Sequence, residues 1–278
     1  LAAADVVTMD ADGFTLNWTS ADAVARIVNY LALGGADLTN AKTGQITAAT
    51  ATGNQATTGV GFQPDCMLFW MFQVGTAAPP LSSTAPQFTL GLASSATARG
   101  LSAGKSQAAN PANTSKYQVA TKVYAAIVGA SDTIAKECDL VSFDSDGFTL
   151  NWTTVNAFAT YVFYVALKGG QFKVGAFNQA TATGNQATTG VGFQPQAIVF
   201  TSVNAVASAS VAAGSRFSLG AGSSSTARGC LWTGDTDNVT PTVAASDLDR
   251  AKVLKMLSEA ASPTTAAAAD LVSLDSDG

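Results

Sequence analysis

One stretch of sixteen residues, ATATGNQATTGVGFQP, occurs twice without a single difference, at Ala49–Pro64 and at Ala180–Pro195. The residues that follow differ: DCMLFWMF after the first copy and QAIVFTSV after the second. An exact repeat constrains the fold because the same local structure must form at two places in the chain. The stretch is small and polar, with Gly-Asn at its centre. We therefore expect a hairpin loop or ribbon that leads into a buried strand at Phe62.

The identical stretch is part of a longer self-match. DADGFTLNWT at Asp10–Thr19 recurs as DSDGFTLNWT at Asp144–Thr153, and LGLASSATARG at Leu90–Gly100 recurs as LGAGSSSTARG at Leu219–Gly229. The separations lie between 129 residues (90 to 219) and 134 residues (10 to 144), with 131 for the identical stretch (49 to 180). A unit of this length has the size of a domain and is too long for one turn of a solenoid.

We therefore expect one module over residues 1–133 and a second over 134–263, with the first strand of a third over 264–278. The third begins with DLVSLDSDG and stops before the FTLNWT with which both earlier hairpins continue. Two interpretations stay open: the chain is cut from a longer array, or the unfinished hairpin pairs with another copy. Both predict a protein that continues end to end.

The residue pattern predicts β structure almost throughout. Apolar and polar residues alternate in Gly13–Thr19, which is typical of a strand with one solvated face. Ala159–Lys168 is apolar on both faces, so we expect a buried central strand. Ser246–Ser262 has a helical pattern, but its counterpart Thr121–Val128 is a plain strand, so we expect a strand over Ala251–Leu257. The prediction is an all-β fold of two tandem, homologous β-sandwich (jelly-roll-like) modules.

Composition restricts the partners. Charged residues make up 12% of the chain, about half the usual share, and the net charge is −5 with scattered basic residues. We expect no nucleic-acid partner, and no apolar run is long enough to predict a membrane span. A surface so poor in charge favours coverage by neighbouring copies, in a homo-oligomer or polymer. A soluble β protein coated with Thr and Ser is the alternative.

Catalytic groups are scarce. The chain has no histidine, which excludes Ser-His-Asp and Cys-His nucleophiles and imidazole zinc sites, and its only glutamates are Glu137 and Glu259. Cys66, Cys138 and Cys230 are odd in number and have Ala or Leu as repeat counterparts, so we expect buried hydrophobes instead of disulfides. The Asp-x-Asp-Gly turns resemble the start of a calcium loop but lack the further oxygen ligands, and a hairpin turn explains them. We expect a non-enzymatic protein without metal or cofactor.

Three residues are candidates for ligand contact. Arg99 and Arg228 occupy the same place in both modules, where they could bind a carboxylate or sulfate, or could hold backbone carbonyl groups between two strands. Trp232 lies beside the polar loop GDTDN and is the better candidate for stacking on a sugar ring. Trp18 and Trp152 lie at period-2 spacing with Phe and Leu, on the same face of the strand, and we expect both in the core.

The identical loops supply the candidates for assembly contacts: Asn54 and Gln55 in the first copy, and Asn185 and Gln186 in the second. Loops usually diverge faster than core strands, but here the loop is unchanged and the strand after it is not. Recent duplication is one explanation. The explanation that we favour is that both loops meet the same surface, such as the next module or subunit.

The segments DSDGFTLNWT, ATYVFYVALKGGQFKVGAF and TGNQATTGVGFQPQAIVF resemble the repeated β-sandwich modules of tail, fibre and surface proteins of tailed phages and environmental viruses. The resemblance implies a building block of a virion surface or an extracellular location, and it brings no catalytic residues. We therefore expect a structural repeat protein that assembles into a virion component or extracellular filament. The alternative is an adhesin that binds a cell-surface glycan.

Overall fold

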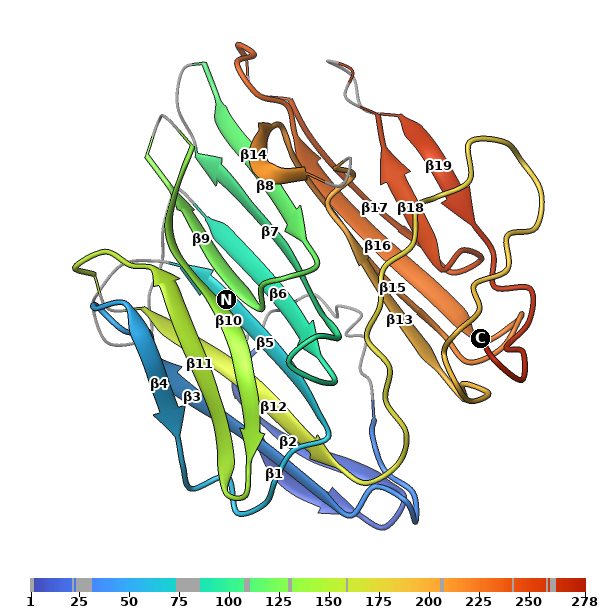
Figure 1. Cartoon of the computed structure of the whole chain (residues 1–278). Helices are drawn as coiled ribbons and strands as arrows, with labels where there is room; N and C mark the ends of the chain where they lie inside the picture. The colour runs from blue at the N-terminus through green and yellow to red at the C-terminus, as the bar shows by residue number, and fades with distance from the viewer. Residues whose placement is uncertain are drawn as a thin grey trace. The chain divides into compact units, whose positions relative to one another are not determined.

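The computed structural model describes residues 3–21, 23, 32–73, 86–107, 111–129, 132–158, 160–205, 208–241, 243–258, 260 and 264–278. In this part of the chain the regular structure consists of strands in antiparallel sheets, without a helix (Figure 1). The predicted all-β class is confirmed. Two compact units make up the chain, residues 1–35 and residues 36–278.

The first unit contains one hairpin of β1 (Ala3–Asp10) and β2 (Gly13–Ser20). Its turn is the Asp-x-Asp-Gly motif, and Gly13 has a φ of 158°. Each strand has one partner, the other strand of the hairpin, among the described residues. The predicted strand with alternating residues is therefore present.

The second unit begins with a β-sandwich of two sheets (Figure 1). The smaller sheet has the order β4-β11-β10-β9, and the larger has the order β14-β8-β7-β6-β5-β12-β3. The strands of this sandwich in chain order are β3 (Asn40–Thr47), β4 (Gly53–Thr57), β5 (Cys66–Gln73), β6 (Gln87–Ala93), β7 (Arg99–Gln107), β8 (Asn113–Val119), β9 (Tyr124–Val128), β10 (Thr133–Asp144), β11 (Gly147–Thr154) and β12 (Tyr161–Lys168).

The core of the sandwich lies between the two sheets. Phe148 of β11 contacts Phe69 of β5 and Tyr164 of β12 edge-on, with ring centroids 5.6 and 5.2 Å apart. Both sheets contribute to the same cluster of buried side chains, which also includes Leu140 and Trp152. Alternate residues of each strand face this cluster, as the period of a strand requires. Edge-on aromatic pairs and close packing of this kind stabilise the two layers.

A second series of strands follows: β13 (Ile198–Ser202), β14 (Ser208–Ala213), β15 (Ser215–Gly222), β16 (Arg228–Asp235), β17 (Ala244–Asp249), β18 (Leu254–Leu257) and β19 (Thr265–Ala269). The order β13-β15-β16-β17 matches β5-β6-β7-β8 of the first sandwich, and the two-stranded sheet β18-β19 matches β9-β10. β14 leaves its own series and pairs with β8.

Two details of the sequence prediction have different outcomes. The apolar segment before Lys168 is β12, which lies between β5 and β3 inside the larger sheet, as predicted. We expected a strand over Ala251–Leu257, and the structure has the shorter strand β18 over Leu254–Leu257. Its pairing with β19 confirms strand in place of the helix that the residue pattern favours, because sheet pairing outweighs the weak intrinsic preference for helix.

The predicted module boundary at 133/134 requires a correction. It falls at the start of β10, which pairs with β9 on one side and with β11 on the other, inside one sheet. The first sandwich therefore uses residues on both sides of that boundary, from 40 to 168. The repeat length is unchanged, but the folded sandwich begins and ends at other residues than the predicted module does.

Candidate assembly surfaces

The first copy of the identical loop holds the turn between β10 and β11. The two carboxylate oxygens of Asp146 accept hydrogen bonds from the backbone N–H groups of Gly59 (2.9 Å) and Gly61 (2.6 Å). The Gln63 side chain donates a hydrogen bond of 2.7 Å to the carbonyl oxygen of Phe143. Gly147 approaches the loop so closely that an added Cβ would lie 1.9 Å from the carbonyl oxygen of Thr57. The close fit between the loop and the turn restricts the residues that either segment can accept.

Asn54 and Gln55 lie on β4, which pairs with β11. Asn54 is opposite Asn151, and Gln55 is opposite Leu150. The side chain of Gln55 accepts a hydrogen bond of 2.7 Å from the indole Nε1 of Trp152 and donates one of 3.0 Å to the carbonyl oxygen of Thr47. The two predicted assembly candidates of the first copy are thus strand residues that contact the Asp-Ser-Asp-Gly hairpin within the chain.

The second copy repeats the contacts of the turn. Asp277 accepts hydrogen bonds from the backbone N–H groups of Gly190 (3.1 Å) and Gly192 (2.7 Å), and Gln194 donates to the carbonyl oxygen of Leu274 at 2.8 Å. In both copies the loop binds the hairpin that begins the next sequence repeat. Because the hairpin sequence is itself repeated, an unchanged loop has a physical reason that does not require recent duplication.

The second copy differs from the first in its strand pairing. Gly184–Thr188 has the same sequence as β4, but it is not a strand and its residues are exposed, Asn185 among them. The Gln186 side chain still donates to a backbone carbonyl, that of Asn178, at 2.8 Å. Its oxygen accepts instead from the backbone N–H of Ala180 at 2.9 Å.

The turns carry carboxylates that are held in their charged form. The backbone N–H groups of Gly59 and then Gly61 keep the pKa of the Asp146 carboxyl below its ordinary value. Asp277 has a lowered pKa for the same reason, with Gly192 the stronger donor and Gly190 the weaker. Hydrogen bonds to the ionised form favour that form. Docking of loop and turn is therefore coupled to ionisation of these two carboxyl groups.

The β1–β2 hairpin reproduces the β10–β11 hairpin without its surroundings. Trp18 is opposite Ala4 as Trp152 is opposite Cys138, and both hairpins have an irregularity at the equivalent step, between Val6 and Thr8 in β1. Trp152 is 1% exposed, whereas Trp18 is 51% exposed. The expectation that both tryptophans lie in the core is correct for Trp152 and, within the described residues, wrong for Trp18.

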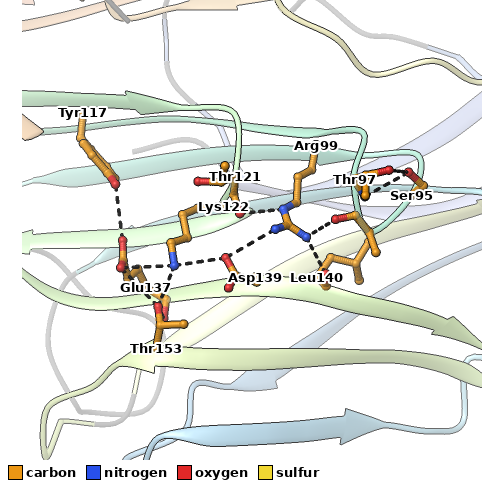
Figure 2. Close-up of polar contacts among 11 residues, drawn as sticks. Ser95, Thr97, Arg99, Tyr117, Thr121, Lys122, Glu137, Asp139, Leu140 and Thr153 are labelled. Atoms are coloured by element: carbon orange, nitrogen blue, oxygen red, sulfur yellow. Dashed lines mark hydrogen bonds and ion pairs between the residues drawn. The ribbon is translucent and has the colours of Figure 1, made fainter. Parts of the chain in front are cut away.

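Arg99 lies at the start of β7 and binds backbone carbonyl groups (Figure 2). Its Nε donates to the carbonyl oxygen of Thr121 at 2.6 Å, and one terminal nitrogen donates to those of Ala96 and Leu140, the latter at 2.7 Å. The other terminal nitrogen is 3.8 Å from a carboxylate oxygen of Asp139. Of the two roles that the sequence suggested for Arg99, these bonds match the binding of backbone carbonyl groups between strands and not the binding of a carboxylate or sulfate.

Lys122 extends the same cluster (Figure 2). Its Nζ is 3.4 Å from a carboxylate oxygen of Glu137 and 3.1 Å from one of Asp139, and it donates to the hydroxyl of Thr153 at 2.8 Å. Burial, and then the charge of Glu137, raises the pKa of Tyr117 to about 12. Arg99 at the start of β7 and Lys122 between β8 and β9 thus pair with Glu137 and Asp139 of β10, so the cluster ties the two sheets together.

Arg228 has the equivalent arrangement in the second series. Its Nε donates to the carbonyl oxygen of Ala251 at 2.6 Å, and a terminal nitrogen donates to that of Leu271 at 3.1 Å. Asp270 is 3.4 Å from Arg228 and 3.0 Å from Lys252. Both guanidinium groups thus bind backbone carbonyl oxygens and lie beside an aspartate.

Trp232, the candidate for sugar stacking, is buried. Its side chain is 9% exposed on β16, and the hollow beside it, lined also by Arg216 and Leu257, has a volume of only 10 Å³. A sugar ring needs an accessible indole face, which this position does not offer. The sequence placed Trp232 beside a polar loop but could not show that β18 covers it.

The contact between the two series of strands was not predicted. β14 pairs with β8, with Ala213 opposite Ser115, and the rings of Phe88 and Phe217 lie 4.7 Å apart. Arg216 is 2% exposed and donates to the carbonyl oxygen of Asp235 at 2.6 Å. Arg216 belongs to no motif that the two copies share, because the equivalent residue of the first copy is Gln87.

Other functional groups add no site. All three cysteines are free and buried, as predicted. Burial is the main cause that raises the pKa of Cys66 to about 12 and that of Cys138 well above its ordinary value. Within the described ranges, no three His, Cys, Asp or Glu side chains are grouped so that they could hold a metal ion. The same residues include no helix that is long and apolar enough to cross a membrane.

Comparisons of the chain with protein-family models, with curated proteins and with solved structures found no match.

Proposed function

We propose that the chain is a non-enzymatic structural protein that assembles with copies of itself, through its repeated β modules, into a virion component or extracellular filament. The observation that carries the proposal is the repeated binding of a loop to the hairpin of the next sequence repeat. Asp146 binds Gly59 and Gly61, and Asp277 binds Gly190 and Gly192, through the same atoms. Contacts that lead from one repeat to the next are what an end-to-end array requires.

The pairing of β14 with β8 supports the same function. Strand addition at a sheet edge joins the two series through the backbone, and the Asp237 carboxylate accepts a hydrogen bond of 2.7 Å from the backbone N–H of Thr114. Successive repeats of this chain therefore associate by edges and loops. The setting in a virion or filament comes from the resemblance of the hairpin, strand and loop motifs to virion modules.

The glycan-binding alternative has less support from three of the residues that suggested it. Trp232 is buried, and Arg99 and Arg228 are bonded to backbone carbonyl groups.

The experiment that tests the proposal is electron microscopy of the purified 278-residue chain in negative stain, with light scattering, over a wide range of protein concentration. We expect regular filaments, rings or sheets that form without a ligand and lengthen with concentration. Single particles of constant mass at every concentration would overturn the proposal. Irregular aggregates with no repeating distance would overturn it as well, because assembly through defined edges gives a regular product.

A further inference from the structure

Lys105 is a buried lysine whose amino group contacts both a side-chain amide and a carboxylate. It lies on β7, and its side chain is 1% exposed. Its Nζ donates to the side-chain oxygen of Asn113 and, at 2.6 Å, to a carboxylate oxygen of Asp132. It also donates to the carbonyl oxygen of Gly129 at 2.5 Å. All three hydrogens of the ammonium group therefore have acceptors.

The fold brings these groups together from both sheets of the first sandwich. Lys105 is opposite Ser115 and Gln107 is opposite Asn113, so Lys105 and Asn113 are diagonal neighbours on one face of the larger sheet. Asp132 is the residue before β10 of the smaller sheet, and its φ of 53° lies in the left-handed region. Residues other than glycine are uncommon in that region. The chain adopts this conformation at the residue whose carboxylate faces Lys105.

The stem of Lys105 lies beside an apolar cluster. Leu101 and Ala103 precede Lys105 at alternate positions of β7, and both belong to a buried cluster with side chains of β8 and β9. Separate charges are costly in such surroundings. Transfer of one proton from the ammonium group to Asp132, along their hydrogen bond, removes both charges and leaves a neutral amine.

We propose that the side chains of Lys105 and Asn113 form a covalent amide bond, with Asp132 as the proton carrier. A neutral amine is a nucleophile, and the electrophile is Cγ of Asn113, which is bonded to the oxygen that Nζ already contacts. Holding the two groups in contact makes their reaction intramolecular, which lowers the barrier to a reaction that is very slow between free amines and amides. The bond forms within one chain and does not depend on assembly.

The reaction exchanges one amide for another, and nothing is oxidised or reduced. The electron pair of the neutral Nζ forms the Nζ–Cγ bond, and the π pair of the Asn113 carbonyl group moves to its oxygen. When the carbonyl group forms again, the Cγ–Nδ2 bond breaks and its electron pair stays on Nδ2. This nitrogen takes the proton from Asp132 and leaves as ammonia. Asp132 then takes the surplus proton of Nζ, as a general acid and base does in acyl transfer.

The second series forms the equivalent strands without this lysine. Gly234 of β16 has the place of Lys105, because Gly234 is opposite Arg216 as Lys105 is opposite Gln87. Lys136 is also buried, but it donates to the backbone carbonyl groups of Ala49 and Asn156. The contact of an amine with both a side-chain amide and a carboxylate is thus a property of the Lys105 site and not a requirement of the repeated strands.

The bond would strengthen the edge to which the second series is attached. It closes the β7–β8 hairpin at the first residue of β8, and β14 pairs with β8. The next residue, Thr114, donates its backbone N–H to Asp237. A covalent link at this point prevents the start of β8 from separating from β7 when the sheet edge opens locally.

Mass spectrometry of the purified, unaltered 278-residue chain tests the proposal. The bond releases ammonia, so the intact mass under denaturing conditions should be lower than the sequence mass by one ammonia molecule. Trypsin cleaves after lysine only when the side chain is unmodified. Residues 100–116 should therefore appear as one peptide in place of 100–105 and 106–116. Fragmentation of that peptide should place the link between residues 105 and 113.

Three variants, each checked for folding by circular dichroism, identify the groups that react. Lys105→Arg should have its full sequence mass, which also distinguishes the link from a succinimide at Asn113, since a succinimide loses ammonia without a lysine. Asp132→Asn should leave most of the chain unlinked, because the proton carrier is gone. Lys122→Arg is the matched control. Lys122 is also paired with carboxylates, so its replacement should leave the loss of ammonia unchanged.

Three results would overturn the inference. The first is a folded, unaltered chain with its full sequence mass. The second is the loss of one water molecule instead of ammonia, because that product joins Lys105 to Asp132. The third is a loss of ammonia that persists in Lys105→Arg. Complete linkage in Asp132→Asn would overturn the role of Asp132 as the proton carrier.

Discussion

The indole Nε1 of Trp152 donates a hydrogen bond of 2.7 Å to the side-chain oxygen of Gln55, which is 97 residues earlier in the chain. Trp152 is 1% exposed, and the ring of Tyr124 packs edge-on against it at 5.4 Å. An indole N–H in such surroundings requires an acceptor. In the first sandwich the identical loop and the repeated hairpin thus constrain one another.

Replacement of Gln55 tests this relationship. Gln55→Leu leaves the Trp152 N–H without its acceptor, so we expect the free energy of unfolding to fall by about 1–3 kcal/mol. Urea unfolding of the first sandwich, followed by tryptophan fluorescence, measures the change.

Gln186→Leu is the matched control, because Gln186 accepts from a backbone N–H in an exposed segment. At low protein concentration this substitution should change stability by less than about 0.5 kcal/mol, as is usual for surface positions. Equal losses at the two positions would show that the indole hydrogen bond is not what makes Gln55 important.

Acid should release the turn from the loop. The pKa of the Asp146 carboxyl lies below its ordinary value in the folded chain because the carboxylate accepts hydrogen bonds from Gly59 and Gly61. A carboxyl whose folded pKa is lowered stabilises the fold fully above its unfolded value, and this contribution is lost as the pH falls through the folded pKa. The amide resonances of Gly59 and Gly61 should therefore titrate with a midpoint below the ordinary pKa of an aspartate carboxyl. Asp146→Asn should abolish this titration, and a midpoint at or above the ordinary value would contradict the interpretation.

The sequence predicted the strands but did not show at which point of the repeat a folded sandwich begins. Alternation in Gly13–Thr19 and the apolar run before Lys168 predicted strands that are present as β2 and β12. A repeat has the same period wherever it is cut, so the length of 131 residues could not show that the sandwich starts near Asn40. Only long-range pairing such as that of β4 with β11 fixes the starting point.

Burial of the tryptophans could not be predicted for a related reason. Trp18 and Trp152 have the same neighbours in sequence, but Trp152 belongs to the buried cluster between the two sheets of the first sandwich, whereas Trp18 is exposed. Trp232 shows the opposite case, a residue beside a polar loop that another strand covers. A local sequence pattern indicates which residues can be buried, but whether they are buried depends on the strands that pack against them.

Arg99 should contribute to stability and not to ligand binding. Arg99→Leu removes the donors to the carbonyl oxygens of Thr121 and Leu140, and we expect a loss of about 1–3 kcal/mol in the free energy of unfolding. Arg99→Lys should restore only part of it, because an ammonium group cannot reproduce the planar fork of the guanidinium group. Arg250→Leu, at an exposed position, is the control and should have little effect. Full rescue by lysine would indicate that charge alone matters here.

Gly91 should tolerate no side chain, because β6 passes directly over the backbone of the residue before β9. A Cβ at Gly91 would lie 1.8 Å from the carbonyl oxygen of Val123, and a Cβ at the equivalent Gly220 would lie 1.7 Å from that of Val253. Both obstacles are backbone atoms, and the N–H of Val123 is itself bonded to the carbonyl oxygen of Cys138 at 3.1 Å, so the strand cannot simply move aside. Gly91→Ala should therefore lower the free energy of unfolding by about 3 kcal/mol or more through overpacking.

The control for Gly91→Ala is Gly100→Ala, in the same repeated segment. A Cβ at Gly100 would meet no atom within 4 Å, so alanine there should leave stability unchanged or slightly raised. Thermal unfolding of the two variants, measured by circular dichroism, distinguishes them, since their chemical change is identical and only the space differs. A similar melting temperature for both would mean that β6 and β9 separate easily. The close approach of the two strands would then not explain why glycine stands at both Gly91 and Gly220.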